Sequence, residues 1–307
     1  MNLKENNIFG RKVFFLCPTF DFQKIIIERL FNLEYEVYVI HNVADAKNIL
    51  IHYPDSICFI NIDSSLDSPQ WFNFVHSFEQ DPVLSTIFLG IISHQNKIRD
   101  KELFLLNAEI PAGFISTAAN YDELTKTFVN ILELNGAMGR RKYIRTDCSR
   151  DRFVFARLTV STETYDLKIK DISSIGFSVD IPIIYENQIK LNLVVRNCTI
   201  KIHDKSIIEP CTMIIANPQG ENIHVVMVFL KGMSFASKAV IRSYIHSNLQ
   251  KNLAEILRGC IPDTTDYSVS SSEESDIKEP FTISSPDDTI EELEKFDESD
   301  LTLTNLF

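Results

Sequence analysis

The first 135 residues alternate short apolar runs with segments of helical period, and this alternation limits the possible folds more than any other feature. The apolar runs occupy residues 13–17, 36–40, 57–62, 86–92 and 113–116, and the helical segments occupy residues 22–33, 43–51, 69–79, 97–106 and 122–134. Strands that alternate with helices form a parallel sheet with helices on both faces. The pattern therefore predicts an α/β flavodoxin-like domain over residues 1–135.

The pattern changes after Gly136, where β-branched and aromatic runs are separated by turn residues. These runs cover residues 152–161, 165–172, 177–181, 188–202, 211–216 and 223–229, and a helical segment follows at 238–257. Short strands spaced in this way are typical of a small antiparallel barrel. We expect a linker at 136–147 and a β-barrel with a closing helix at 148–259.

The acidity of the chain is concentrated at its end. The formal charge is -12, but residues 261–307 hold 14 of the 42 acidic residues and two of the 30 Lys and Arg residues. Residues 1–260 therefore carry 28 acidic and 28 basic residues, and their formal charge is zero. The end of the chain is also rich in Ser and Thr and poor in aliphatic residues, so we expect an acidic disordered tail at 260–307.

The sequence lacks the motifs of redox-active or metal-binding cysteine pairs, of nucleotide-phosphate loops and of histidine metal sites. The six cysteines form no CxxC pair, the nine glycines form no phosphate-binding loop, and the seven histidines lack metal-ligand spacing. The sequence shows neither a signal peptide nor a membrane span. We expect a cytoplasmic protein that is not an enzyme, with no cofactor, no metal, no nucleic-acid partner and no membrane insertion.

Two short segments carry the functional signal. The arginine segment, residues 140–145, reads RRKYIR, and the turn segment, residues 171–176, reads DISSIG. Taken singly, the first is also compatible with a solvated basic linker and the second with an ordinary β-turn. In this order, with a β-rich run between them, they resemble the RxxxR and [DN]xSxxG motifs of the PilZ family of bacterial cyclic di-GMP receptors.

The resemblance implies roles for six residues. Arg141 and Arg145 are expected to grip guanine or phosphate, because a guanidinium is a planar, bidentate donor. Arg140 adds a cation that in the family tends to accompany a stacked pair of ligands. Asp171 is expected to accept from guanine and Ser173 to bond near the base or phosphate. At the sixth position, Gly176, we expect a positive φ or a close approach of the ligand.

The first domain resembles the receiver domains of two-component signalling but lacks their phosphorylation residues. A receiver needs an acidic pair after its first strand, an Asp at the end of the third and a Lys after the fifth. This sequence offers Cys17-Pro18, Asn61 with Asp63 two places on, and Ser116-Thr117. We expect a receiver-like scaffold for dimerisation or partner docking; an active receiver phosphorylated at Asn61 or Asp63 is the weaker alternative.

These features predict a cyclic di-GMP effector that changes its interdomain arrangement and signals to a protein partner in motility, surface or envelope processes. Ligand is expected to order the linker, and the partner is expected to bind the receiver-like domain or the tail. The tail contains three apolar residues at roughly helical spacing, Ile290, Leu293 and Phe296. This spacing suits a short helix that binds in a groove of the protein partner. Alternatively, the tail acids cover the arginine segment. The rival hypothesis is a nucleotide-independent PilZ adaptor that binds only proteins.

Overall fold

The first half of the chain forms a five-stranded parallel sheet. The computed structural model describes residues 9–95, 97–160, 163–188, 190–230 and 233–268. The strands are β1 (Val13–Leu16), β2 (Val37–Ile40), β3 (Ile57–Asn61), β4 (Phe88–Ser93) and β5 (Gly113–Ser116). They pair in the order β2-β1-β3-β4-β5, and every pair is parallel. This is the flavodoxin-like order that the sequence predicts.

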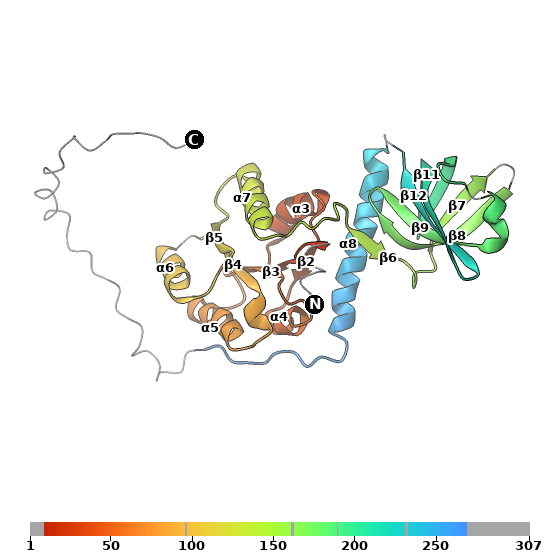
Figure 1. The fold of residues 1–307 in the computed structure, drawn as a ribbon. Helices are drawn as coiled ribbons and strands as arrows, with labels where there is room; N and C mark the ends of the chain where they lie inside the picture. The colour runs from red at the N-terminus through yellow and green to blue at the C-terminus, as the bar shows by residue number, and fades with distance from the viewer. Residues whose placement is uncertain (1–8, 96, 161–162, 189, 231–232, 269–307) are drawn as a thin grey trace, which may run out of the picture. The chain divides into compact units, whose positions relative to one another are not determined.

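Helices cover both faces of this sheet (Figure 1). They are α2 (Phe20–Phe22), the π-helical turn η1 (Gln23–Ile27), α3 (Glu28–Asn32), α4 (Val43–Leu50), α5 (Ser68–Glu79), the 3₁₀ turn η2 (Leu84–Thr86), α6 (Ile98–Asn107) and α7 (Tyr121–Leu134). Successive side chains of β1 point to opposite faces, so Phe14 belongs to one hydrophobic cluster with Trp71, and Phe15 to another with Phe128. Burial on both faces explains why the strands read as continuous apolar runs.

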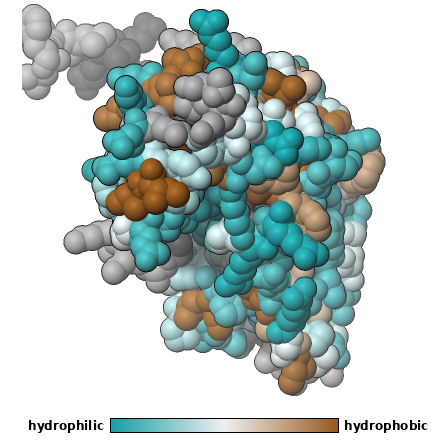
Figure 2. Space-filling model, turned by 90° about the vertical axis from the view of Figure 1, so that its right-hand side faces the viewer, coloured by the Kyte–Doolittle hydropathy of each residue, from teal (hydrophilic) through white to brown (hydrophobic). Residues whose placement is uncertain are grey.

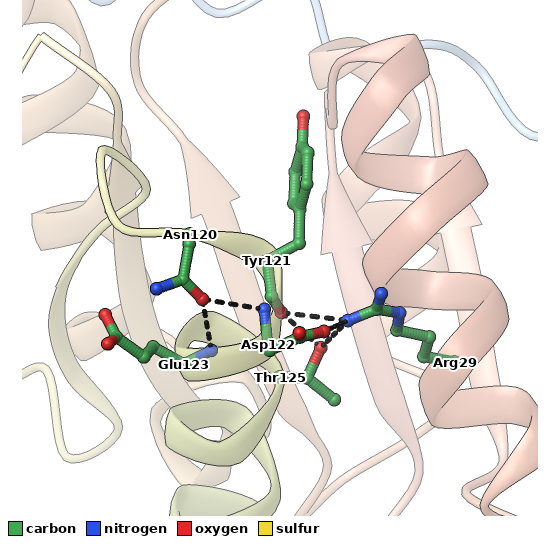
Figure 3. Close-up of polar contacts among 6 residues, drawn as sticks. All are labelled: Arg29, Asn120, Tyr121, Asp122, Glu123 and Thr125. Atoms are coloured by element: carbon green, nitrogen blue, oxygen red, sulfur yellow. Dashed lines mark hydrogen bonds and ion pairs between the residues drawn. The ribbon is translucent and has the colours of Figure 1, made fainter.

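A network around Arg29 joins α3 to the start of α7 (Figure 3). The Arg29 guanidinium donates to the Tyr121 carbonyl oxygen at 3.1 Å, to the Asp122 carboxylate at 2.7 Å and to the Thr125 hydroxyl at 3.1 Å. Asn120 caps α7, since its side-chain oxygen accepts from the backbone of the second and third residues of the helix at 3.1 and 2.9 Å. The cap satisfies amide groups that a helix N-terminus leaves unpaired.

The second half of the chain forms a closed antiparallel barrel. Its elements are β6 (Arg145–Asp147), β7 (Val154–Val160), β8 (Glu163–Ser173), β9 (Gly176–Pro182), the 3₁₀ turn η3 (Ile183–Gln188), β10 (Val194–Ile202), β11 (Lys205–Gln219) and β12 (Asn222–Phe229). The strand order is β6-β8-β7-β10-β11-β12-β9, and β8 also pairs with β9. That last pairing closes a ring of six strands, to which β6 is added at β8.

The closing helix α8 (Phe235–Ile256) contacts both the barrel and the parallel sheet. Together these parts form one compact unit that ends at Ser268. On the barrel side, the Asn248 amide donates to the Thr146 hydroxyl at 2.6 Å and to the Asp147 carbonyl oxygen at 3.0 Å. On the sheet side, the Gln250 amide faces Val39 of edge strand β2. With its nitrogen turned to the Val39 carbonyl, it bonds both backbone groups of Val39 at 3.2 Å. At this edge, Gln250 thus supplies the backbone hydrogen bonds that a neighbouring strand would otherwise make.

Residues 261–267 lie against α4 and α5, although composition predicted a disordered tail from residue 260. The Asp263 amide donates to the Ala44 carbonyl oxygen at 2.8 Å, and the buried ring of Tyr267 packs edge-on against Phe74 at 5.3 Å. The prediction was wrong for this stretch because hydrogen bonds and the ring of Tyr267 bind it to the first domain. The tail positions Ile290, Leu293 and Phe296 lie outside the described residues.

The surface at the right-hand side of Figure 1, near β7 and β8, is mainly hydrophilic. Figure 2 shows hydrophobic side chains in separate groups among hydrophilic ones on its coloured part. Scattered apolar groups of this kind are ordinary on a protein surface. Within the described ranges, no helix is long and apolar enough to cross a membrane.

Candidate ligand-binding site

Strand pairing brings the two predicted segments together. The arginine segment ends in β6 and the turn segment begins in β8, and these two strands are antiparallel neighbours. Their register places Arg145 opposite Ser173 and Asp147 opposite Asp171. Residues 26 positions apart in the sequence, Arg145 and Asp171, therefore lie on one surface of the barrel.

The centre of the candidate site is the pair formed by Arg145 and Asp171. An Nη atom of Arg145 lies 3.6 Å from a carboxylate oxygen of Asp171, and the two side chains are 38% and 33% exposed. The separation exceeds the 2.7 to 3.2 Å of a close N–H···O bond, so both groups keep capacity for other partners. The second Asp171 oxygen accepts a short hydrogen bond from the Ser178 hydroxyl. This bond fixes the orientation of the carboxylate.

Ser173 and Gly176 are buried and shape the turn that carries the site. The Ser173 hydroxyl donates to the Gly176 carbonyl oxygen at 3.1 Å. The φ of Gly176 lies outside the left-handed region, so the expected positive φ is absent here. Instead, a Cβ at this position would lie 2.2 Å from the backbone oxygen of Met227 in β12. Glycine is needed because two strands approach closely.

Arg141 stacks on an aromatic ring from the start of the chain. Its guanidinium carbon lies 4.6 Å from the ring centroid of Phe9, which is 39% exposed. Burial lowers the pKa of Arg141, the neighbouring charge of Arg145 lowers it further, and the carboxylates of Asp171 and Glu36 oppose this effect. Two guanidinium groups that repel one another favour an anion between them.

The remaining members of the arginine segment differ in burial. Arg140, Lys142 and Tyr143 are exposed, whereas Ile144 is buried. The segment is therefore anchored at Ile144 and presents its cations to solvent on either side. Arg140 precedes strand β6 by five positions.

The arrangement suits a ligand with both anionic and base-like groups. Guanidinium groups bind phosphate oxygens bidentately and bind the O6 and N7 atoms of guanine in the same way. An ionised carboxylate accepts from N–H donors such as those of guanine N1 and N2. Arg141, Arg145 and Asp171 offer all three contacts over a surface that is partly exposed.

Two contributors to this surface do not follow from the sequence motifs. The position of Ser178 could in principle be predicted from the turn between β8 and β9. If Ser173 pairs with Gly176 across that turn, then two residues further along each strand Asp171 pairs with Ser178. Phe9 gives no such signal, because an isolated aromatic residue near the start of the chain has no pattern that would link it to Arg141.

In the first domain, a hydrogen-bonded group lies at the carboxyl edge of the sheet, where β3 and β4 end. Asp63 accepts from the Ser93 hydroxyl at 2.7 Å and from the His94 amide at 2.6 Å. The Asn61 amide donates to the Cys17 carbonyl oxygen at 2.8 Å. Both Asp63 oxygens have protein partners. Among the residues that the structure describes, no three His, Cys, Asp or Glu side chains are grouped to hold a metal ion.

No protein-family model and no curated protein matches this sequence. Among solved structures, the chain is similar to the PilZ domain of YcgR from Escherichia coli with c-di-GMP, at 11% identity and a TM-score of 0.34, over 39% of this chain and 99% of that one. A second similar structure is the K. pneumonia MrkH complex with c-di-GMP, at 16% identity and a TM-score of 0.32, over 40% of this chain and 57% of MrkH.

A response regulator from Desulfuromonas acetoxidans is similar at 15% identity and a TM-score of 0.33, over 40% of this chain and 98% of that one. The chain thus matches nearly the whole length of the isolated YcgR domain, but little more than half of MrkH. The strand orders described above give a five-stranded parallel α/β sheet and a closed antiparallel barrel of six strands.

Proposed function

We propose that this chain is a cyclic di-GMP effector that binds the nucleotide between its arginine segment and its turn segment. The observation that carries the proposal is the β6–β8 pairing, which brings the Arg145 guanidinium within 3.6 Å of Asp171. The candidate ligand contacts are Arg140, Arg141, Arg145, Asp171, Ser173 and Gly176. Of these, Ser173 and Gly176 are buried, so their contribution is the shape of the turn.

The chemistry of the exposed members fits the ligand. Cyclic di-GMP has two phosphate anions and two guanines. Arg141 and Arg145 supply cations for the phosphates and bidentate donors for guanine, and Asp171 supplies an acceptor for the guanine N–H groups. Arg140 adds a third cation, which favours two stacked ligands at one site.

The proposed signal is a change in the arrangement of the receiver-like domain relative to the barrel when the nucleotide binds. The arginine segment continues directly from the receiver-like domain, so fixing it restricts the connection between the domains. Because Ile144 is buried and Arg145–Asp147 already pair with β8, the proposed rearrangement concerns residues 136–143. A protein partner that binds the receiver-like domain or the tail would read this change, in motility, surface or envelope processes.

The first test is binding of fluorescent cyclic di-GMP, followed by fluorescence anisotropy, with unlabelled nucleotides as competitors. Cyclic di-GMP should displace the probe at least roughly tenfold better than cyclic di-AMP, because adenine lacks the O6 acceptor that arginine contacts. GMP should also compete poorly, since it lacks the second phosphate and base. A chain that binds no probe would instead be an adaptor for protein partners.

The interdomain part of the proposal has its own test. Small-angle scattering should give different curves for the chain with and without saturating cyclic di-GMP. Identical curves, measured on a sample that demonstrably binds the nucleotide, would remove the rearrangement and leave the binding function intact.

A further inference from the structure

Glu34 lies between α3 and β2 of the receiver-like sheet, on the side of that domain that meets the barrel. Its φ is 69°, a left-handed conformation that non-glycine residues seldom adopt. Its side chain is only 10% exposed. A buried carboxylate in such a backbone persists only where its surroundings hold it firmly.

The Glu34 carboxylate accepts hydrogen bonds from three segments that are far apart in the sequence. The Ser174 hydroxyl donates to one oxygen at 2.7 Å, and the Ile144 amide donates to the other at 3.2 Å. Arg242 of α8 donates to the first oxygen from Nη at 2.9 Å and from Nε at 3.3 Å. The charge of Arg242 offsets the cost of burying the carboxylate.

Two of these donors belong to the candidate nucleotide site. Ser174 is the fourth residue of the turn segment, and Ile144 directly precedes Arg145 in the arginine segment. One carboxylate of the receiver-like domain therefore bonds to both segments, in addition to the pairing of β6 with β8. Arg145 is placed from one side by its pairing with β8 and from the other by the Ile144 bond.

We propose that Glu34 is a positioning residue for the cyclic di-GMP site, so that the receiver-like domain sets the nucleotide affinity of the barrel. This inference rests on the proposed function. Without Glu34, the ligand must itself order the arginine and turn segments, and binding weakens by the cost of that ordering. Linkage makes the effect reciprocal, so bound nucleotide must strengthen the contact between the domains.

Gln250 offers a matched control. It also joins α8 to the receiver-like sheet, through the backbone of Val39, and among the described residues its hydrogen bonds reach neither segment of the candidate site. A general weakening of the domain contact would therefore appear in Gln250→Ala as well as in Glu34→Ala. An effect confined to Glu34 points to its bonds with Ile144 and Ser174.

The experiment combines calorimetric titration of cyclic di-GMP with amide hydrogen exchange of the free protein. Glu34→Ala should bind roughly tenfold more weakly than the wild type, and the amide of Ile144 should exchange faster without ligand. Glu34→Gln keeps one acceptor oxygen and should fall between the two. Gln250→Ala should bind as the wild type does.

The outcomes separate this inference from the proposed function. Wild-type affinity in Glu34→Ala would overturn the positioning role while the binding function stands. An equal loss in Gln250→Ala would also overturn it, since the domain contact as a whole would then be responsible. A wild-type chain that binds no cyclic di-GMP would overturn the proposed function itself, and the inference with it.

Discussion

The Arg145 guanidinium lies 3.6 Å from the Asp171 carboxylate across the antiparallel pair of β6 and β8. The other oxygen of Asp171 is held by the Ser178 hydroxyl from β9. Three adjacent strands thus fix two of the groups that are proposed to meet the nucleotide. A site built on strands keeps its geometry better than one built on loops.

The first prediction concerns the turn beside this pair. Gly176→Ala should lower the free energy of unfolding by about 2 to 3 kcal/mol, because its Cβ would overlap the Met227 carbonyl oxygen of the neighbouring strand. Urea denaturation measures this change. Gly220→Asn is the control, since Gly220 has a φ of 62° that Asn tolerates and open space around it. Equal losses in the two variants would contradict the close-approach explanation.

The second prediction tests the attachment of residues 261–267. Tyr267→Ala should destabilise the protein by about 2 kcal/mol, because it removes a buried ring and the hydrogen bond from its hydroxyl to Asp263 at 2.6 Å. Thermal unfolding gives the measurement, with the exposed Thr264→Ala as control. An unchanged melting temperature in Tyr267→Ala would mean that this stretch adds nothing to the fold.

Asp263 explains why this attachment should survive mild acid. Although burial raises its pKa, hydrogen bonds from Thr265 and Tyr267, with help from the Lys47 charge, bring it down to about 2. A depressed carboxyl pKa contributes stability above the unfolded value near 4, and that stability is lost only as the pH falls toward 2.

The third prediction is a pH dependence at His246. Burial lowers the pKa of this histidine, Glu28 opposes the effect, and the Nε2 atom is buried without a partner among the described residues. The unfolded chain therefore binds a proton more readily, and stability should fall as the pH drops below the unfolded pKa of about 6.5. In His246→Phe, which keeps a ring beside Phe31, the loss between pH 7.5 and 5.5 should be smaller. Parallel losses in both proteins would refute this assignment.

The sequence predicted the parallel sheet well, since each buried strand is a continuous apolar run between helical segments. The barrel was predicted less completely. Strand β6 was missed because only Thr146 of its three residues is buried, so it lacks an apolar pattern. The start of β11 was missed because hydropathy does not follow burial there: Glu209 is buried and Ile208 is exposed. In both places the apolar residues leave no alternating pattern from which a strand could be predicted.

The candidate site was predictable only where its residues form local motifs. The arginine and turn segments could be read directly, and their meeting follows from strand pairing. Glu34 could not be found in this way, because its partners Ile144, Ser174 and Arg242 lie 110, 140 and 208 residues away. Contacts between domains depend on tertiary structure and leave no spacing in the sequence.

The central claim is that both segments bind cyclic di-GMP, and its most direct test is calorimetric titration of the nucleotide into the wild type and the Arg141→Ala, Arg145→Ala double variant. Lys142→Ala, which removes an exposed cation between the two arginines, is the matched control. We expect micromolar or tighter binding, about -8 kcal/mol, in the wild type and the control, with two ligands per site, and no binding in the double variant. Absence of binding by the wild type, or unchanged binding by the double variant, would contradict it.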